Sequence, residues 1–301
     1  MNIRKILLLG AILFSISSTQ AQRWMRESSL DFGIFAGGSN YTGELSNFKF
    51  FEAKSTHFAA GLLTRYNIGN RLTFKIAATR GSISGNDEWY SDISKNTLRN
   101  LHFRSVLWDF SAGIDINLRL LDRGKQRGMV PYFTTGFSVF KFNPEAQFFY
   151  NINSPHNTGV NGYQTLSGRD EEWVTLQPLS TEGQQTAEYN ELKRYSLTQM
   201  AIPIGLGLKC YMNKHWTVAL EYAVRKTFTD HLDDVSGKYA EPFYIESQYG
   251  PIASAMADPS TSLHETGTLR GDPENKDWYG IFGISLTYRL STAKVRCFQF
   301  K

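Results

Sequence analysis

The chain has 301 residues, of which 41% are hydrophobic, 20% are charged and 14% are aromatic, and its formal net charge is +4. Its two cysteines, Cys210 and Cys297, are too few and too far apart for a disulfide scaffold or a zinc cluster. The charged residues form no basic stripe, so the sequence does not favour nucleic acid as a partner. No run of about 20 apolar residues follows the first 20 positions, which excludes a polytopic helical membrane protein but leaves a transmembrane β-barrel open.

The N-terminal segment predicts a secretory signal peptide over residues 1–21. Arg4 and Lys5 precede the apolar run 6–16, and small or polar residues then lead to Ala21. The apolar run is too short for a membrane anchor, and no cysteine follows it for lipid attachment. We therefore expect Sec-dependent export and cleavage after Ala21, which would leave 30 basic and 28 acidic residues out of the original 32 and 28.

From residue 29 onward the apolar residues recur with a period of two, which is typical of β-strands. In the clearest segment, Val106, Trp108 and Phe110 alternate with small or polar residues such as Ser111. The segment 130–142 is strand-like but alternates weakly. Eight strands, each long enough to cross a bilayer at a tilt (about 9–11 residues), are predicted. In chain order they lie within 30–37, 57–66, 72–79, 105–118, 130–142, 199–209, 216–225 and 278–289.

The connections between these segments alternate strictly between short and long. The short ones are 67–70, 121–129 and 212–215, and the long ones are 42–55, 81–97, 143–194 and 228–276. Outer-membrane barrels have short periplasmic turns and long extracellular loops. The sequence therefore predicts an all-β, eight-stranded antiparallel transmembrane barrel of the outer membrane over residues 22–290. A basic tail, 291–301, follows it.

Aromatic residues near the strand ends agree with two membrane interfaces. The expected periplasmic belt is Tyr66, Tyr132, Trp216 and Tyr288, and the expected outer belt is Tyr41, Tyr195 and Trp278. The alternative is a soluble β-sandwich or a lipocalin-like barrel. It is less favoured because the apolar face of the strands is large and uniform, whereas the other face is rich in Gly, Ala, Ser and Thr, which suit a narrow lumen.

The alternation also places four acidic and four basic residues on the inward face, where charges persist if they are paired. We interpret them as a salt-bridge network that plugs the lumen, since eight strands leave room only for side chains. A small regulated pore is the alternative. The eight residues are Asp31, Arg65, Lys75, Asp109, Asp115, Lys209, Glu221 and Arg225.

The sequence offers little support for an enzyme. His57 and His102 fall near the outer strand ends, with Ser55 and Ser105 close in sequence, but no carboxylate is fixed beside them. We therefore expect no catalytic residues, no cofactor and no small-molecule substrate.

Three aspartates at the start of the last long loop, Asp230, Asp233 and Asp234, are weak candidates for calcium ligands. Their spacing does not match an EF-hand, whose ligands alternate and end in a distal Glu. We prefer to interpret them as an Asx-stabilised turn and predict no metal site.

Several sequence strings resemble the PorG family, the small outer-membrane barrel of the type IX (Por) secretion system. The resemblance runs over nearly the whole mature chain, and the strings occur in the same order. They are FNPEA (142–146), LQPLSTEGQ (176–184), YSLTQMAIPIGLG (195–207), RKTFTDHLDDVSG (225–237) and KDWY (276–279).

The resemblance implies a non-enzymatic barrel in outer-membrane lipid that anchors or assembles a periplasmic ring of PorK and PorN type. Partner contacts would then lie on the periplasmic side. The candidates there are Asn67, Arg71, Asp122, Arg123, Lys125, Arg127, Asn213 and Lys214. The alternative is a stand-alone structural or porin-like barrel of the OmpA type. One departure is the tail 291–301 with Cys297, because such barrels often end on an aromatic residue of the last strand.

Overall fold

A computed structural model describes residues 28–46, 53–90, 99–120, 127–151, 153, 162–260 and 264–293. The predicted signal peptide, residues 294–301 and the side chains of 291–293 lie outside that description. Among the described residues, no helix combines the length and the apolar composition needed to cross a membrane.

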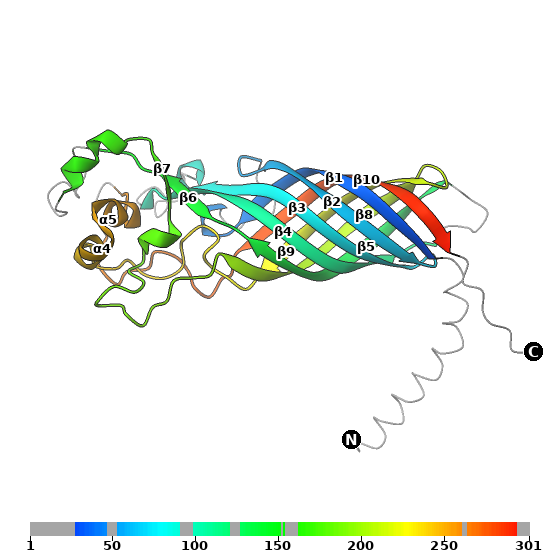
Figure 1. Ribbon diagram of the computed structural model, residues 1–301. Helices are drawn as coiled ribbons and strands as arrows, with labels where there is room; N and C mark the ends of the chain where they lie inside the picture. Colours follow the sequence, from blue (N-terminus) through cyan, green and yellow to red (C-terminus); the bar gives the residue numbers. More distant parts are fainter. Residues whose placement is uncertain are drawn as a thin grey trace, which may run out of the picture.

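Eight long antiparallel strands close into a barrel, as predicted (Figure 1). Each strand pairs with its neighbours in sequence, and β1 closes the ring by pairing with β10. The strands are β1 (Ser28–Thr42), β2 (His57–Ile68), β3 (Leu72–Asn86), β4 (His102–Asn117), β5 (Gly128–Lys141), β8 (Thr198–Tyr211), β9 (Trp216–Thr227) and β10 (Trp278–Ala293).

Several strands run further than their alternation indicates. β3 and β4 stay paired out to Asn86 and His102, so this hairpin projects beyond the rest of the wall. The last strand pairs with β1 as far as Ala293. The expected boundary between barrel and tail at residue 290 therefore falls three residues too early. Polar residues at strand ends weaken the alternation, although the backbone pairing continues through them.

Short and long connections fall at opposite ends of the barrel. The turns after β2, β4 and β8 share one end with the start of β1 and the end of β10, and the long connections gather at the other (Figure 1). The long connections contain η1 (Glu44–Ser46), η2 (Asp87–Tyr90), β6 (Pro144–Gln147), η3 (Tyr163–Arg169), β7 (Trp173–Thr175), η4 (Gln177–Leu179), α4 (Pro242–Tyr249) and α5 (Pro251–Ala257). We call the described residues of these connections the loop cap.

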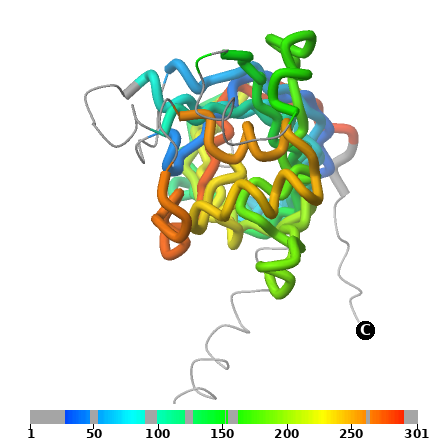
Figure 2. The backbone as a smooth tube through the Cα atoms, turned by 90° about the vertical axis from the view of Figure 1, so that its left-hand side faces the viewer, coloured from blue at the N-terminus to red at the C-terminus, as the bar shows by residue number. Residues whose placement is uncertain are grey.

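The loop cap is an ordered layer over the barrel mouth. β6 continues the sheet beside the projecting end of β4, and β7 pairs with β6. Seen from that end, α4 and α5 cross in front of the barrel (Figure 2). Each of these helices begins at a proline, and Gly250 joins them with a φ of 86°, a left-handed conformation that suits glycine.

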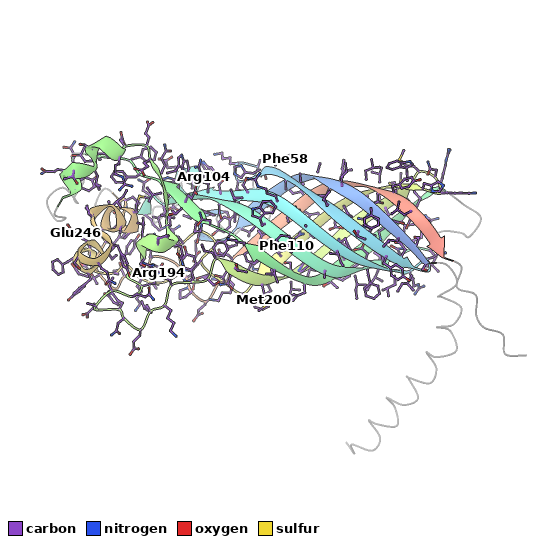
Figure 3. The ribbon with its side chains drawn as sticks, in the orientation of Figure 1. Phe58, Arg104, Phe110, Arg194, Met200 and Glu246 are labelled. Atoms are coloured by element: carbon purple, nitrogen blue, oxygen red, sulfur yellow. The ribbon has the colours of Figure 1, made fainter. Side chains whose placement is uncertain are left out.

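The apolar residues divide between the barrel exterior and the cap. Large side chains such as Phe58, Phe110 and Met200 project outward from the wall (Figure 3), with 73%, 56% and 51% of their surface exposed. The main buried apolar cluster instead spans the upper lumen and the cap. Its members include Tyr41, Leu45, Phe103, Phe140, Phe142, Leu176, Leu232 and Tyr279.

Three of the expected interfacial aromatics lie elsewhere: Tyr132, Tyr41, and Tyr195, whose ring stacks on His231 in the cap and whose hydroxyl donates to Asp234. Tyr66, Trp216 and Tyr288 are exposed on the exterior near the short turns, but Tyr132 is fully buried in the lumen. Tyr41, assigned to the outer belt, is also fully buried. Tyr41 is an even number of residues from Asp31 on the same strand, so its side chain points into the lumen although it lies near a strand end. Tyr132 explains the weak alternation of 130–142, since an aromatic residue occupies the inward face there.

Candidate functional site: the charged lumen and the loop cap

The middle of the lumen is built around one carboxylate. Asp115 on β4 is fully buried and lies 3.0 Å from Lys209, 3.4 Å from Lys75 and 3.7 Å from Arg65. These partners come from β8, β3 and β2, so the contacts reach across the lumen as well as along the wall. An ionic cluster of this kind fills the space that a pore would need.

A second acid joins this cluster through a tyrosine. Glu221 on β9 accepts hydrogen bonds from Lys75 at 2.7 Å and from the Tyr132 hydroxyl at 2.6 Å. The strand register sets Gly207 between Tyr132 and Glu221. A Cβ atom at Gly207 would overlap the Tyr132 ring, so glycine is what allows the ring to lie flat across β8.

Near the short turns, a third group closes the lumen. Asp31 accepts hydrogen bonds from Arg289 at 3.1 Å and from the Asn67 side-chain amide at 2.7 Å. Asn67 also accepts from Thr73. Asn67 was expected to face a periplasmic partner, but its side chain points inward and only 9% of the residue is exposed. Arg289 was missed, although it pairs with Asp31 in the β1–β10 register and has inward parity.

At the upper end of the lumen, Asp109 accepts a hydrogen bond from the Tyr279 hydroxyl at 2.7 Å and lies 3.7 Å from Arg225. Phe140 packs edge-on against Tyr279, with ring centroids 5.0 Å apart. The structure therefore places all eight of the charged residues expected inside the barrel on its lumen side, in three connected groups. The two-residue alternation along the strands is the signal that predicted their inward position.

The three aspartates of the last loop do not form one site. Asp233 accepts hydrogen bonds from the Val235 backbone N–H and from the Tyr41 hydroxyl, the first of which is an Asx turn. Asp234 instead accepts from Thr181 and Tyr195. Of the three, Asp230 is the one whose carboxylate joins acids from other segments in a group that could hold a metal ion.

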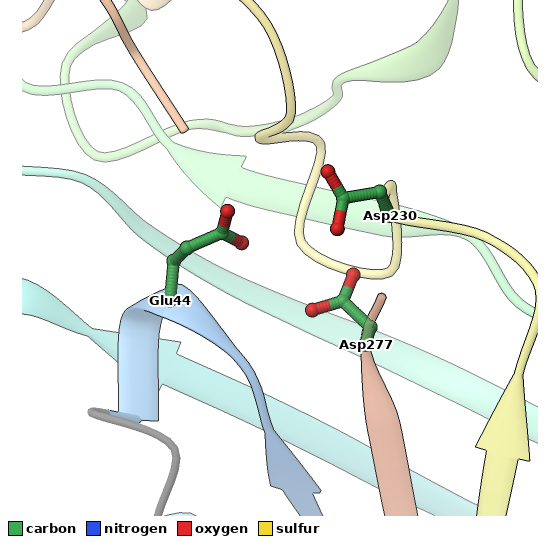
Figure 4. A group of neighbouring side chains, drawn as sticks. All are labelled: Glu44, Asp230 and Asp277. Carbon is green, nitrogen blue, oxygen red and sulfur yellow. The ribbon is translucent and has the colours of Figure 1, made fainter. Parts of the chain in front are cut away.

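Asp230 meets Glu44 and Asp277, and the three carboxylates point toward a common space (Figure 4). One oxygen from each lies within 4.8 Å of the others. Sequence spacing could not reveal this group, because Glu44 follows β1 whereas Asp277 precedes β10.

Burial raises the pKa values of these acids. It raises the pKa of Asp230 to about 7, and burial together with the charge of Asp233 raises that of Glu44 to about 9. Burial and the neighbouring acids Asp233 and Glu44 hold the pKa of Asp277 well above its ordinary value. The group is therefore unfavourable as a set of free, ionised carboxylates.

Backbone N–H groups of the cap donate hydrogen bonds to two of its acids, Glu182 and Asp277. Glu182 accepts hydrogen bonds from the Ser236 and Gly237 backbone N–H groups and lies 3.3 Å from buried Arg270. The Leu232 backbone N–H donates to Asp277 at 3.0 Å. These contacts join 176–184, 225–237 and 276–279, three of the strings that carry the family resemblance.

The histidines considered for catalysis contact neither of the serines near them in sequence through a described hydrogen bond. His57 Nε2 lies 2.7 Å from the Ser84 hydroxyl, and His102 Nε2 accepts from the Gln147 backbone N–H at 2.9 Å. His102 also lines a cap pocket of about 380 Å³, together with Tyr163, Met256 and Arg270. Its walls mix apolar and polar groups and include Ser260, whose hydroxyl donates to Asp258 and lies 3.5 Å from His264 Nδ1.

The remaining residues expected to contact a periplasmic partner lie at the short-turn end. Arg71, Arg127, Asn213 and Lys214 are exposed there. The side chain of Asn213 caps the turn by accepting from the backbone N–H groups of His215 and Trp216. Asp122, Arg123 and Lys125 lie outside the described residues.

Comparison with known proteins gives one family and a set of similar structures. The family model described as a domain of unknown function (DUF6089) matches residues 4–161. A search of curated proteins found no match.

Three solved structures illustrate the structural similarity. Ail, the attachment invasion locus protein of Yersinia pestis, is 10% identical with a TM-score of 0.35, covering 88% of this chain and 98% of that one. Neisserial surface protein A is 9% identical with a TM-score of 0.36, covering 88% and 97%. OprG from Pseudomonas aeruginosa is 11% identical with a TM-score of 0.36, covering 87% and 97%. The barrel assignment made above rests on the strand pairing itself.

Proposed function

The chain belongs to the DUF6089 family, and we propose that it is a non-enzymatic, structural β-barrel of the outer membrane with a filled lumen and an extracellular loop cap. The observation that carries this proposal is the contrast between the two faces of the wall. The outward face is apolar around the barrel, as lipid requires, and the inward face holds paired charges that fill the space.

The position of the charged exterior residues supports the orientation. Arg80, Trp108 and Lys141 are cross-strand neighbours in one row on β3, β4 and β5, toward the cap end of the exterior. Arg80 lies over the Trp108 ring at 5.5 Å. A row of cations beside an interfacial aromatic suits the outer leaflet boundary, where anionic head groups meet the hydrocarbon. The cap would then face the outside and the short turns the periplasm.

Site-directed labelling tests this arrangement. In a Cys210→Ser, Cys297→Ser background, which has no native cysteine, Gly168→Cys in the cap should react with a membrane-impermeant maleimide on intact cells. Lys214→Cys in the turn after β8 should react only after the outer membrane is permeabilised. Reaction of Lys214→Cys on intact cells, or recovery of the protein outside the outer-membrane fraction, would contradict the proposal.

A finer assignment follows from the PorG resemblance: the barrel serves type IX secretion by anchoring a periplasmic ring of PorK and PorN type. Its support is that three of the five resembling strings, 176–184, 225–237 and 276–279, are joined by hydrogen bonds in the cap. The periplasmic contacts would use the exposed turn residues Arg71, Arg127 and Lys214.

Deletion of the gene, followed by quantification of exported proteins that carry the C-terminal sorting signal, tests this role. Accumulation of those proteins in the periplasm of cells with an intact outer membrane is expected. A complementing copy with Arg71→Glu, Arg127→Glu and Lys214→Glu should restore the barrel but not export, whereas Arg104→Glu on the cap side serves as the matched control. Unchanged export after deletion would favour the stand-alone structural barrel.

A further inference from the structure

Three carboxylates that are distant in sequence meet at the junction of the barrel mouth and the cap. Glu44 lies in η1, directly after β1, whereas Asp230 follows β9 and Asp277 precedes β10. Figure 4 shows the three side chains converging from these segments. Asp277 is fully buried and Asp230 is 3% exposed, whereas Glu44 is partly exposed at the edge of the group.

The carboxylate of Asp230 is the decisive feature. Neither of its oxygens has a hydrogen-bond partner of acceptable geometry among the described residues, and the same holds for Glu44 Oε2. The hydroxyl of Ser236 is close enough to favour the charged form of Asp230 but does not complete a hydrogen bond. Leaving a buried carboxylate without donors costs several kcal/mol, roughly, so such groups are normally paired or bound to a metal.

The other oxygens of the group are held in place by neutral donors. Asp277 accepts from the Leu232 backbone N–H at 3.0 Å. Its other oxygen lies 2.9 Å from the Tyr41 hydroxyl oxygen, whose one proton is shared with Asp233. Glu44 accepts from the Asp272 backbone N–H at 2.7 Å. These bonds orient the carboxylates without neutralising their charge.

Nearby cationic side chains are engaged elsewhere. Arg99 donates to Asp87 at 2.7 Å and 2.9 Å, and also to the Arg270 carbonyl. Lys276 donates to the Pro273 carbonyl at 2.6 Å. Within the described chain, none of the three clustered acids has a basic group within ion-pair distance, in contrast to the acids of the lumen.

We propose that Glu44, Asp230 and Asp277 bind one Ca²⁺ ion, which joins the first extracellular loop to both ends of the last. Calcium takes oxygen ligands at about 2.3–2.6 Å in flexible geometry, so oxygens on opposite sides of the ion are about 4.6–5.2 Å apart. One oxygen from each acid lies within 4.8 Å of the others, which is compatible with that arrangement. Magnesium binds at about 2.0–2.1 Å and demands near-ideal octahedral geometry, which three acids from two different loops are poorly placed to supply.

The site would act as a staple for the cap. Its ligands flank β1, β9 and β10, and Tyr41 links Asp277 to Asp233 in the Asx turn. Removing the ion would leave buried like charges at the base of the last loop, and the loop would separate from the barrel mouth. The proposal extends the account of the cap and holds whether or not the barrel serves secretion.

Calcium binding is tested on the full-length mature protein in detergent, after treatment with EGTA. Isothermal titration with CaCl₂ should show one saturable site per chain, with much weaker binding of MgCl₂. Terbium luminescence excited through tyrosine should appear and be displaced by CaCl₂, since the Tyr41 hydroxyl lies beside the ligand Asp277. Asp230→Asn should weaken Ca²⁺ binding by at least about tenfold, because even indirect partners of a metal site contribute about 10–100-fold.

Two controls make the result decisive. Asp234→Asn changes a buried acid of the same loop that lies outside the cluster, and Glu145→Gln changes an acid at the cap edge. Both should keep the wild-type affinity, and heat-modifiable migration on gels verifies that each variant is folded. Calcium should also protect residues 228–276 of the wild type from proteolysis, which requires no variant. Absence of saturable binding by the wild type, or equal binding by Asp230→Asn, would overturn the proposal.

Discussion

The lumen and the loop cap both bury acidic side chains, but they neutralise them differently. In the lumen, Asp115 lies within 4 Å of three cationic side chains, and Glu221 is bonded to Lys75. In the cap, Glu44, Asp230 and Asp277 face one another while Arg99 is bonded to Asp87. The lumen is thus electrostatically self-contained, whereas the base of the cap depends on protons or on a bound cation.

The largest loss of stability should appear when the lumen loses its central acid, Asp115. Asp115→Asn leaves Arg65, Lys75 and Lys209 buried with one acid fewer, and breaking a buried ion pair of this kind costs about 3–5 kcal/mol. Urea unfolding of the barrel, followed by tryptophan fluorescence and heat-modifiable migration, measures the loss. Glu145→Gln breaks an exposed pair with Arg104 and should change stability by less than about 1 kcal/mol. Equal effects of the two variants would show that the lumen network is not the main stabilising ionic element.

A smaller loss of stability is expected where the lumen depends on close packing of a side chain against a glycine. Gly207→Ala places a methyl group against the Tyr132 ring, which must move away from Glu221. Overpacking of this kind costs about 1–3 kcal/mol. Gly168→Ala is the matched control, because a Cβ atom there meets nothing within 4 Å. The same unfolding assay separates the two, and a neutral Gly207→Ala would mean that the ring has another place in the lumen.

The smallest effect concerns the pH response of the cap. Burial raises the pKa of Asp234 from 3.8 to about 6. Between pH 3.8 and about 6, Asp234 keeps its proton in the folded cap but loses it in the unfolded segment. The stability that this proton contributes is therefore fully present below about pH 4 and is lost as the pH rises through about 6. Hydrogen exchange of residues 228–276, corrected for its intrinsic pH dependence, should therefore speed up over that range. Asp234→Asn should flatten this dependence, and an unchanged slope would assign it to other groups.

The same contrast explains how far the sequence could predict the molecule. In a strand, the parity of a residue decides which face it occupies, so the strands and inward charges such as Asp115 and Lys209 follow from local pattern. The rule also covers Tyr41, which was assigned to the outer belt by its nearness to a strand end, and Arg289, which was overlooked. Cap contacts such as Glu44 with Asp230 have no local signal, because loop packing alone brings them together. The sequence favours an Asx-stabilised turn for Asp230, Asp233 and Asp234, and Asp233 does form such a turn, but the spacing gives no sign that Asp230 meets Glu44 and Asp277.

The most direct test of the central claim is the ionic conductance of the purified protein in a bilayer. Flotation of proteoliposomes and maleimide labelling of Gly168→Cys would first verify insertion. With the lumen filled by the Asp115 network and the mouth covered by the cap, the inserted barrel should show no steady channel openings. Regular, ohmic conductance from verified, inserted protein would contradict the account and favour a porin-like function.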